Sequence, residues 1–163
     1  MEFHDRAKVT TKTCCFFGHR KIFFTTHEKE GDFFDFLKAQ IENLIVDSGY
    51  NEFLFGGYGD FDETAYRAVK SLKEKYPHIK TVYVQAYYKP HDKNIDLLRE
   101  KYDELTFPEM QTNSKRYTIV YRNRHIINNS HFCIFYVKCD TGGACQALRY
   151  AKQKNKSYLL LPF

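Results

Sequence analysis

The chain of 163 residues is about the length of one domain and is long enough to bury a continuous hydrophobic core. Its formal net charge is only +5, because 25 Lys and Arg residues are interspersed with 20 Asp and Glu residues and form no long basic run. This scattering argues against a dedicated DNA-binding surface, so a nucleic-acid partner is not expected, whereas a small anionic ligand is not excluded. No apolar run approaches the roughly 20 residues that span a membrane, so no membrane partner is expected.

The cysteines and the polar first residues indicate a reduced, cytoplasmic protein. Cys14, Cys15 and Cys133 fall inside apolar runs, where cysteine behaves as a small hydrophobe. The odd count of 5 and the absence of paired CxxC spacing fit neither a disulfide framework nor a structural zinc site, so no metal and no cofactor are expected. We expect a single domain over residues 1–163, in which 1–12 is a loosely ordered N-terminal extension without a signal peptide.

Short β-rich runs alternate with helical stretches along the chain. The first strand is expected at 13–17, and the helix that follows at 26–47 starts with a capping box of Thr25 and Glu28. Residues 104–113 are expected to be irregular. Further strands are expected at 52–55, 81–84, 132–137 and 158–161, and further helices at 61–76, 94–102, 115–128 and from the 141–144 turn through 151.

This alternation predicts an α/β, Rossmann-like fold with a mainly parallel sheet flanked by helices on both faces. Ligands of such sheets bind beyond the carboxyl ends of the strands. Three distinctive loops each follow a strand, namely Gly18-His19-Arg20, the loop 56–60 and Thr141-Gly142-Gly143. We therefore expect these loops to meet at one edge of the sheet and to form a ligand pocket.

The two glycine-rich loops differ in charge, which predicts different roles. Asp60, Asp62 and Glu63 crowd the first loop, so it should bind ribose hydroxyls or a base rather than a phosphate. The second loop has no following acid, and its amides are the better phosphate cradle at a helix start. The predicted ligand-binding residues are Gly18, His19, Arg20, Gly56, Gly57, Tyr58, Gly59, Asp60, Asp62, Arg122, Arg124, Thr141, Gly142 and Gly143.

Each of these patterns has a structural alternative. A glycine pair alone is a tight turn, and neither loop has a Walker GK[ST] ending or the GxGxxG pattern. Glu63 could close a capping box with Asp60, and Arg122 and Arg124 could be surface residues. His19 could be a turn residue. No Ser-His-Asp or Cys-His order that would indicate nucleophilic catalysis stands out. Glu63 lies beside a glycine loop, and its carboxylate is the candidate for a catalytic role.

Four motifs occur in one order along the chain, namely CCFFGHR at 14–20, FGGYGDFD at 55–62, RNR at 122–124 followed by Asn129-Ser130, and GGA at 142–144. This combination resembles the YpsA-like family of the SLOG superfamily, which also contains the DprA and LOG proteins. Phe17 stands where the family commonly has Thr, a departure that removes one hydroxyl from the expected pocket.

The resemblance implies a Rossmann-like fold and a pocket for a nucleotide-like small molecule, so binding or sensing of a nucleoside phosphate or an ADP-ribose-like ligand is the first hypothesis. The alternative is a LOG-type nucleoside 5'-monophosphate N-glycosidase, with Glu63 at the ribosyl centre and Arg124 or Arg122 on the phosphate. The amino-acid sequence of residues 56–63 is similar to the LOG motif PGGxGTxxE. In the order of strands and loops, however, residues 56–63 correspond to a loop that precedes this motif in the LOG proteins. The resemblance therefore does not imply the hydrolytic activity of the LOG proteins for this chain. SLOG relatives suggest a homodimer, and action through a protein partner is a third hypothesis.

Overall fold

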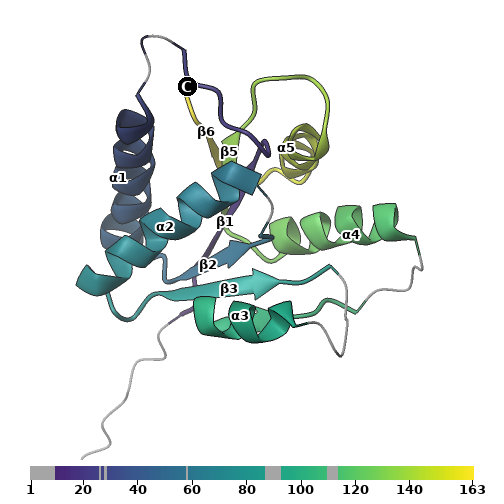
Figure 1. The fold of residues 1–163 in the computed structure, drawn as a ribbon, viewed down its shortest axis with the longest axis horizontal. Coiled ribbons are helices and arrows are strands. Elements are labelled where there is room, and N and C mark those ends of the chain that lie inside the picture. The colour runs from purple at the N-terminus through teal and green to yellow at the C-terminus, as the bar shows by residue number, and fades with distance from the viewer. Residues whose placement is uncertain (1–9, 26, 28, 58, 87–92, 110–113) are drawn as a thin grey trace, which may run out of the picture.

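The computed structural model describes residues 10–25, 27, 29–57, 59–86, 93–109 and 114–163, which form a sheet with helices on both sides (Figure 1). Among these residues, no helix is long and apolar enough to cross a membrane. The strands are β1 (Thr13–Gly18), β2 (Glu52–Phe55), β3 (Lys80–Val84), β4 (Glu104–Thr106), β5 (Phe132–Tyr136) and β6 (Ser157–Leu160). The helices are α1 (Glu30–Ser48), α2 (Gly59–Lys75), α3 (Asn94–Lys101), α4 (Lys115–Asn128) and α5 (Gly143–Gln153).

The six strands run parallel in the order β4-β3-β2-β1-β5-β6, which confirms the predicted Rossmann-like architecture. From β1 the chain moves outward through β2 and β3 to β4, and then it returns to β5 on the other side of β1. The direction of strand addition therefore reverses between β1 and β5. Ligands of open parallel sheets bind at such a reversal, because the loops leaving the two strands diverge to opposite faces.

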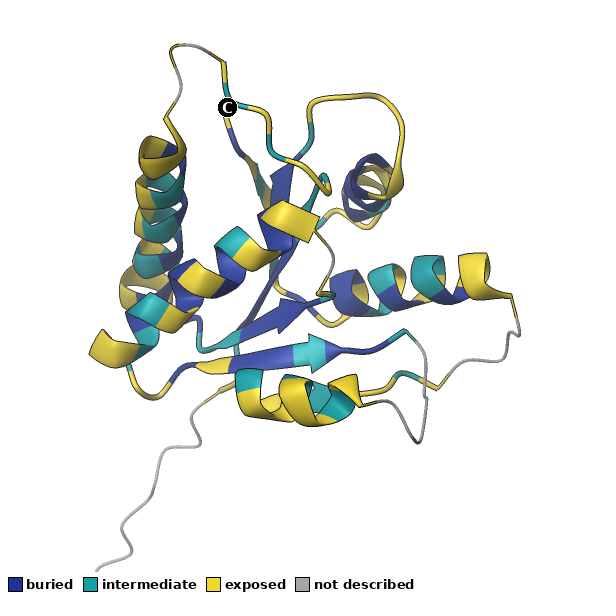
Figure 2. Cartoon of the chain, in the orientation of Figure 1, coloured by how far each residue is buried: buried dark blue, intermediate teal, exposed yellow. Residues whose placement is uncertain are grey.

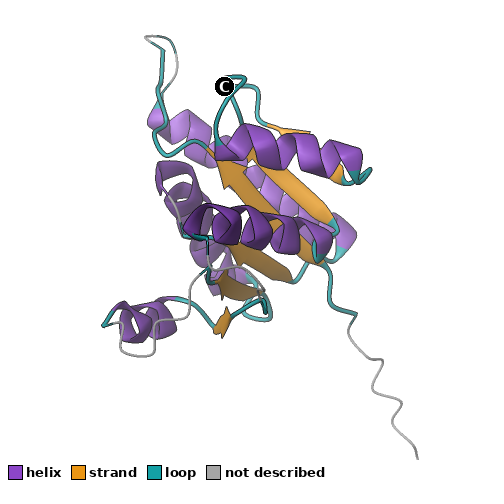
Figure 3. Cartoon of the chain, turned by 90° about the vertical axis from the view of Figure 1, so that its right-hand side faces the viewer, coloured by secondary structure: helices purple, strands orange, loops and turns teal. Residues whose placement is uncertain are grey.

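Helices cover both faces of the sheet (Figures 2 and 3). Each face buries its own set of side chains. Cys14 and Phe16 of β1 pack toward α1 and α2, whereas Cys15 packs toward α4 and α5. Successive side chains of a strand point to opposite faces, so a strand covered on both sides must be apolar at every position. This explains the unbroken apolar runs of β1 and β5.

The cysteines of the strands confirm their predicted role as small core hydrophobes. Cys14, Cys15 and Cys133 are fully buried free thiols, and Cys15 lies beside Cys133 in the register of β1 and β5. Burial raises the pKa of the Cys14 and Cys15 thiols well above the usual value. They are therefore poor nucleophiles and pack as apolar groups.

Two predicted boundaries were wrong. Residues 104–106 form the edge strand β4 instead of an irregular segment, because Asp103 anchors them: its carboxylate accepts the Thr81 N–H at 2.8 Å and its own N–H bonds the Thr81 carbonyl at 3.0 Å. Three residues are too few to show a strand period in the sequence. Helix α1 begins at Glu30 rather than 26, with Lys29 as an N-cap that makes no side-chain hydrogen bond. Glu28 of the expected capping box lies outside the described residues.

Candidate functional site

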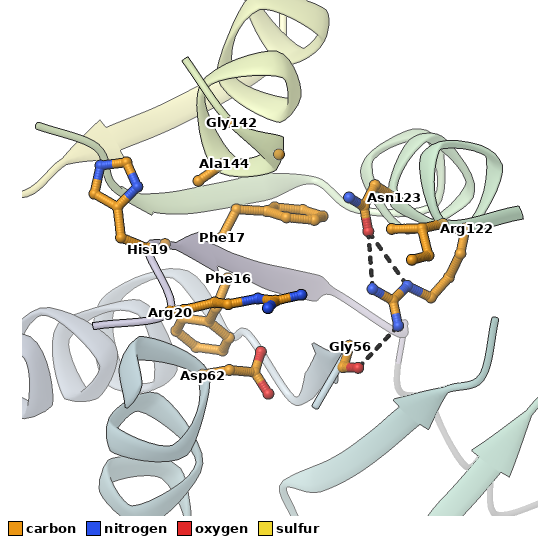
Figure 4. A pocket seen from close by; sticks show the side chains of 13 residues that line it. Phe16, Phe17, His19, Arg20, Gly56, Asp62, Arg122, Asn123, Gly142 and Ala144 are labelled. Atoms are coloured by element: carbon orange, nitrogen blue, oxygen red, sulfur yellow. Dashed lines mark hydrogen bonds between the residues drawn. The ribbon is translucent and has the colours of Figure 1, made fainter. Parts of the chain in front are cut away.

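A cavity of about 330 Å³ lies at the carboxyl edge of the sheet, between the loops that follow the paired strands β1 and β5 (Figure 4). Its walls come from the loops after β1, β2 and β5 and from one face of α4. The volume is at the small end of the range of roughly 300–1000 Å³ for ligand pockets. The lining residues are Phe16, Phe17, Gly18, His19, Arg20, Gly56, Asp62, Ile119, Arg122, Asn123, Gly142, Gly143 and Ala144.

The loop after β1 is attached to both neighbouring loops. His19 Nε2 accepts a hydrogen bond of 2.7 Å from the backbone N–H of Lys138, which ties this loop to the segment after β5. Gly18 has no room for a side chain, because a Cβ atom there would overlap the ring of Phe61 on α2. His19 thus sets the spacing across the crevice, and its Nε2 is already used by the fold.

Arg20 is held in position by the loop after β2. The backbone N–H of Asp60 donates to the Arg20 carbonyl at 2.8 Å. Gly59 passes so close that a Cβ atom would lie 2.5 Å from the Arg20 Cα, and its φ of +88° is in the region that favours glycine. The side chain of Arg20 extends across the cavity above Asp62 (Figure 4). Asp60 therefore acts on the backbone of Arg20 and does not itself line the cavity.

Asp62 is the buried acid of the cavity, with only 8% of its surface exposed. Its Oδ2 accepts a hydrogen bond of 2.8 Å from the N–H of Gly57. Burial raises the pKa of Asp62 to about 6, against the lowering effects of the Gly57 N–H, the Arg122 charge and the Gly56 N–H. At neutral pH the group is therefore mainly an ionised acceptor inside a site of low polarity.

Arg122 on α4 joins that helix to the loop after β2. Its side chain is buried, and Nη1 donates to the carbonyl of Gly56 at 2.9 Å. Nε and Nη2 both donate to Oδ1 of Asn123 at 3.2 Å, so the amide of Asn123 orients the guanidinium (Figure 4). Arg122 thereby places a fixed positive charge in the wall of the cavity, near Asp62.

The amino terminus of α5 forms the opposite wall. Gly142 is its N-cap, with φ of +98°, and Gly143 is its first residue. A Cβ atom on either glycine would meet nothing within 4 Å, so the backbone here faces open space. The first N–H groups of a helix have no acceptor within the helix, and they carry the positive end of its dipole. This wall therefore offers donors to an anion.

The structure brings together most of the predicted ligand-binding residues. Gly18, His19, Arg20, Gly56, Asp62, Arg122, Gly142 and Gly143 line the cavity. Gly57, Gly59, Asp60 and Thr141 belong to the same loops but are not in its wall, and Tyr58 lies outside the described residues.

Glu63 and Arg124, the residues of the catalytic alternative, do not face this cavity. The Glu63 carboxylate bonds the Lys101 ammonium on α3, which also replaces the expected capping box with Asp60. Residues two apart in a helix lie about 200° apart around its axis, so Arg124 must point away when Arg122 faces the site. Its guanidinium lies 5.1 Å from the ring centroid of Tyr150 on α5. Glu63 and Arg124, which the catalytic alternative places around one substrate, are therefore not in the wall of this cavity, whereas Arg122 is.

Sequence reasoning missed four lining residues, although the helix period could have found some of them. Ile119 and Asn123 flank Arg122 on the same face of α4, at i−3 and i+1. Phe17 lines the cavity at the carboxyl end of β1, where the sequence placed it, and its ring stacks on Phe135 with centroids 5.9 Å apart. The other two missed residues are Phe16 and Ala144.

Together, these features define a Rossmann-like α/β domain with a cavity at the point where the strand order reverses. The family model YpsA, described as the YspA SLOG family, matches residues 14–160, and the chain belongs to this family. No curated protein matches the chain.

Two solved structures share the fold. DNA processing protein A (DprA) from Streptococcus pneumoniae superposes with a TM-score of 0.66 at 15% identity, over 95% of this chain and 52% of that one. DprA from Helicobacter pylori, described by its single-stranded DNA binding mode, superposes with a TM-score of 0.62 at 17% identity, over 96% of this chain and 69% of that one. The chain thus spans about half the length of the pneumococcal protein, and identities this low establish the fold alone.

The expectation that a nucleic-acid partner is unlikely is contradicted, because a structure of this fold, DprA from Helicobacter pylori, is described by its single-stranded DNA binding mode. The fold also shows why the charge argument failed. Helix α4 carries four Lys and Arg residues, α5 carries two, and neither contains Asp or Glu. Helix α1, on the other face of the sheet, holds five acids and a single Lys. Among these three helices, charges that are scattered in the sequence are therefore separated in space, whereas α2 carries four acids and four Lys and Arg residues.

Proposed function

We propose that the chain binds a nucleoside phosphate, or a derivative such as ADP-ribose, in the cavity at the carboxyl ends of β1 and β5. The observation that carries the proposal is the grouping of complementary polar groups around one apolar hollow. The amino terminus of α5 and two guanidinium groups surround it, and the carboxylate of Asp62 lies in its wall. A nucleotide needs both kinds of group, because its phosphate is an anion and its ribose presents hydroxyl donors.

The phosphate end belongs at the amino terminus of α5. Gly142 and Gly143 leave the backbone accessible there, and the helix dipole favours a negative group. Arg20 lines the same cavity and can pair with phosphate oxygens through its forked donors. Arg122 adds a positive charge that its bonds to Gly56 and Asn123 hold in place. This arrangement supports binding of one phosphate without a Walker lysine.

The sugar and base end belongs near Asp62 and the end of β1. One oxygen of the Asp62 carboxylate bonds the Gly57 N–H, and the group can accept further hydrogen bonds from hydroxyls. Phe16 and Phe17 line the cavity between this carboxylate and α5 (Figure 4). Aromatic surface beside a hydroxyl acceptor suits a nucleoside.

A thermal-shift screen with AMP, NAD, ADP-ribose and a single-stranded oligodeoxynucleotide tests the proposal. A ligand present at 100 times its Kd should raise the melting temperature by about 5 °C or more. Free base released during the incubation would indicate turnover, with Asp62 as the carboxylate to test first. A panel that leaves the melting temperature unchanged throughout would contradict nucleotide binding.

Replacing Gly143 with valine should weaken binding at least about tenfold without a loss of stability. Its Cβ would meet open space, and a glycine is a poor helix residue, so the free energy of unfolding should stay equal or rise by about 0.5 kcal/mol. The measurement is ligand titration together with thermal unfolding. Gly31→Val is the matched control, since Gly31 also lies in a first helical turn with open space and is remote from the cavity.

Single-stranded DNA is a second candidate ligand, and two specific observations favour it. The fold matches DprA structures, one of which is described by its binding of single-stranded DNA. The cavity also opens beside α4 and α5, where Lys and Arg occur without Asp or Glu. An unstacked nucleotide of a single strand presents the same phosphate, sugar and base as a free nucleotide. The oligonucleotide in the thermal-shift panel tests this candidate beside the small molecules.

A further inference from the structure

A second cavity, of about 240 Å³, lies between α4 and α5. It adjoins the first cavity, because Asn123 and Gly143 line both of them. Its apolar lining comes from Val120, Ile127 and Ala147 on the facing sides of the two helices. The two cavities thus follow one another along the α4 and α5 side of the sheet, past the amino terminus of α5.

Two guanidinium groups line this second cavity, and both are supported by neighbouring groups. Arg124 lies over the ring of Tyr150, with 5.1 Å from Cζ to the ring centroid, and Tyr150 in turn donates to Oδ1 of Asn128 at 2.9 Å. Arg149 donates from Nη2 to the carbonyl of Asp140 at 2.9 Å. Stacking and hydrogen bonding restrict these long side chains, so less entropy is lost when they bind an anion.

The charge around the second cavity is of one sign. Among the described residues that line it, none is Asp or Glu, and the helices that form it carry six Lys and Arg residues and no acid. A single exposed Arg is usually only a solvated surface residue. Two of them in one hollow, without a carboxylate and joined to a site already suited to a phosphate, favour a second anionic group of the same ligand.

We propose that the cavity between α4 and α5 binds a second, phosphate-linked nucleotide unit, with Arg124 and Arg149 on its phosphate and the apolar lining under its base. The inference rests on the proposed function, since the first unit occupies the cavity at the carboxyl ends of β1 and β5. The shared chemistry is a phosphate bridge between two nucleotide units. It is found in a small dinucleotide and in a single strand of nucleic acid alike.

The test compares the affinities of deoxyadenosine monophosphate and its 5'-phosphorylated dinucleotide pdApdA for the wild-type chain, by titration calorimetry at fixed salt. The dinucleotide should bind at least about tenfold more tightly, as expected for one added charged contact. Arg124→Ala should remove this gain and leave the mononucleotide affinity within twofold, and Arg124→Glu should make the dinucleotide the weaker ligand. Arg116→Ala is the matched control, because it removes one charge from α4 outside both cavities.

The outcomes separate the two proposals. In both of two outcomes, mononucleotide binding that depends on Arg122 leaves the first subsite intact. If the dinucleotide binds no more tightly than the mononucleotide, the second subsite is overturned. It is also overturned if the dinucleotide keeps its gain in affinity in Arg124→Ala. Absence of binding by both ligands and by AMP, NAD, ADP-ribose and the oligodeoxynucleotide overturns the proposed function itself. A 12-residue oligodeoxyadenylate and ADP-ribose distinguish the two sources of the ligand. Tighter, Arg124-dependent binding of the oligomer than of pdApdA supports a nucleic-acid strand. Tighter, Arg124-dependent binding of ADP-ribose than of the mononucleotide supports a small pyrophosphate-linked ligand.

Discussion

Replacing Arg122 with alanine is expected to weaken nucleotide binding by about 100-fold and to lower the free energy of unfolding by about 2–4 kcal/mol. The side chain is buried, and it bonds the Gly56 carbonyl at 2.9 Å. Its loss would leave that carbonyl without this donor and would deprive Asp62 of a charge that lowers its pKa. Binding would suffer because the cavity would keep its carboxylate and lose its fixed cation. Denaturant unfolding and ligand titration measure the two effects.

Arg122→Lys separates geometry from charge. A lysine keeps the positive charge but cannot bond Gly56 and Asn123 through one rigid fork. We expect it to restore part of the stability and little of the affinity. Arg116→Ala controls for the loss of one charge from α4. If the nucleotide affinities of the wild type and Arg122→Ala agree within twofold, Arg122 does not contribute to ligand binding.

Replacing Asp62 with asparagine is expected to stabilise the fold at pH 7.5 and to weaken nucleotide binding about tenfold. Burial raises the pKa of Asp62 to about 6 in the folded state, whereas an unfolded Asp titrates near 3.8. At a pH between these two pKa values, Asp62 keeps its proton in the folded chain and has released it in the unfolded chain. The stability of the wild type must therefore fall as the pH rises from about 4 to above 6.

The size of the stabilisation by Asp62→Asn follows from the shift of the Asp62 pKa on folding. Each pKa unit corresponds to about 1.4 kcal/mol, so the gain from Asp62→Asn approaches about 3 kcal/mol at pH 7.5 and vanishes near pH 3.5. The asparagine can still accept the Gly57 N–H, but it lacks the charged acceptor for a ligand hydroxyl. Asp96→Asn is the control, since Asp96 is 85% exposed on α3. Unfolding curves from pH 3.5 to 8 that stay parallel for wild type and Asp62→Asn would contradict this assignment.

The fold could be predicted from the sequence because its strong elements carry local signals. The unbroken apolar runs of β1 and β5 indicated strands buried on both faces, and the bounds of α4 at 115–128 were predicted as observed. The glycine loops after β1, β2 and β5 met at one edge because parallel strands place their carboxyl ends together. Strand β4 was missed because its three residues depend on Asp103, a tertiary contact that no local pattern shows.

The site could be predicted only in part, because the direction of a side chain depends on packing. Asp60, Asp62 and Glu63 look equivalent in the sequence. On α2, however, Asp62 faces the cavity and Glu63 faces Lys101. The charge argument failed for a similar reason, since basic residues of α4 and α5 come together only when the helices share one face of the sheet.

The most direct test of the central claim is calorimetric titration of the wild type and of Gly143→Val with AMP, NAD, ADP-ribose and a single-stranded oligodeoxynucleotide. We predict that at least one of them binds at the cavity of the wild type, and that its affinity falls at least about tenfold in Gly143→Val while Gly31→Val binds normally. Absence of binding by all four ligands, or equal affinity in Gly143→Val, would contradict a nucleotide site at the carboxyl ends of β1 and β5.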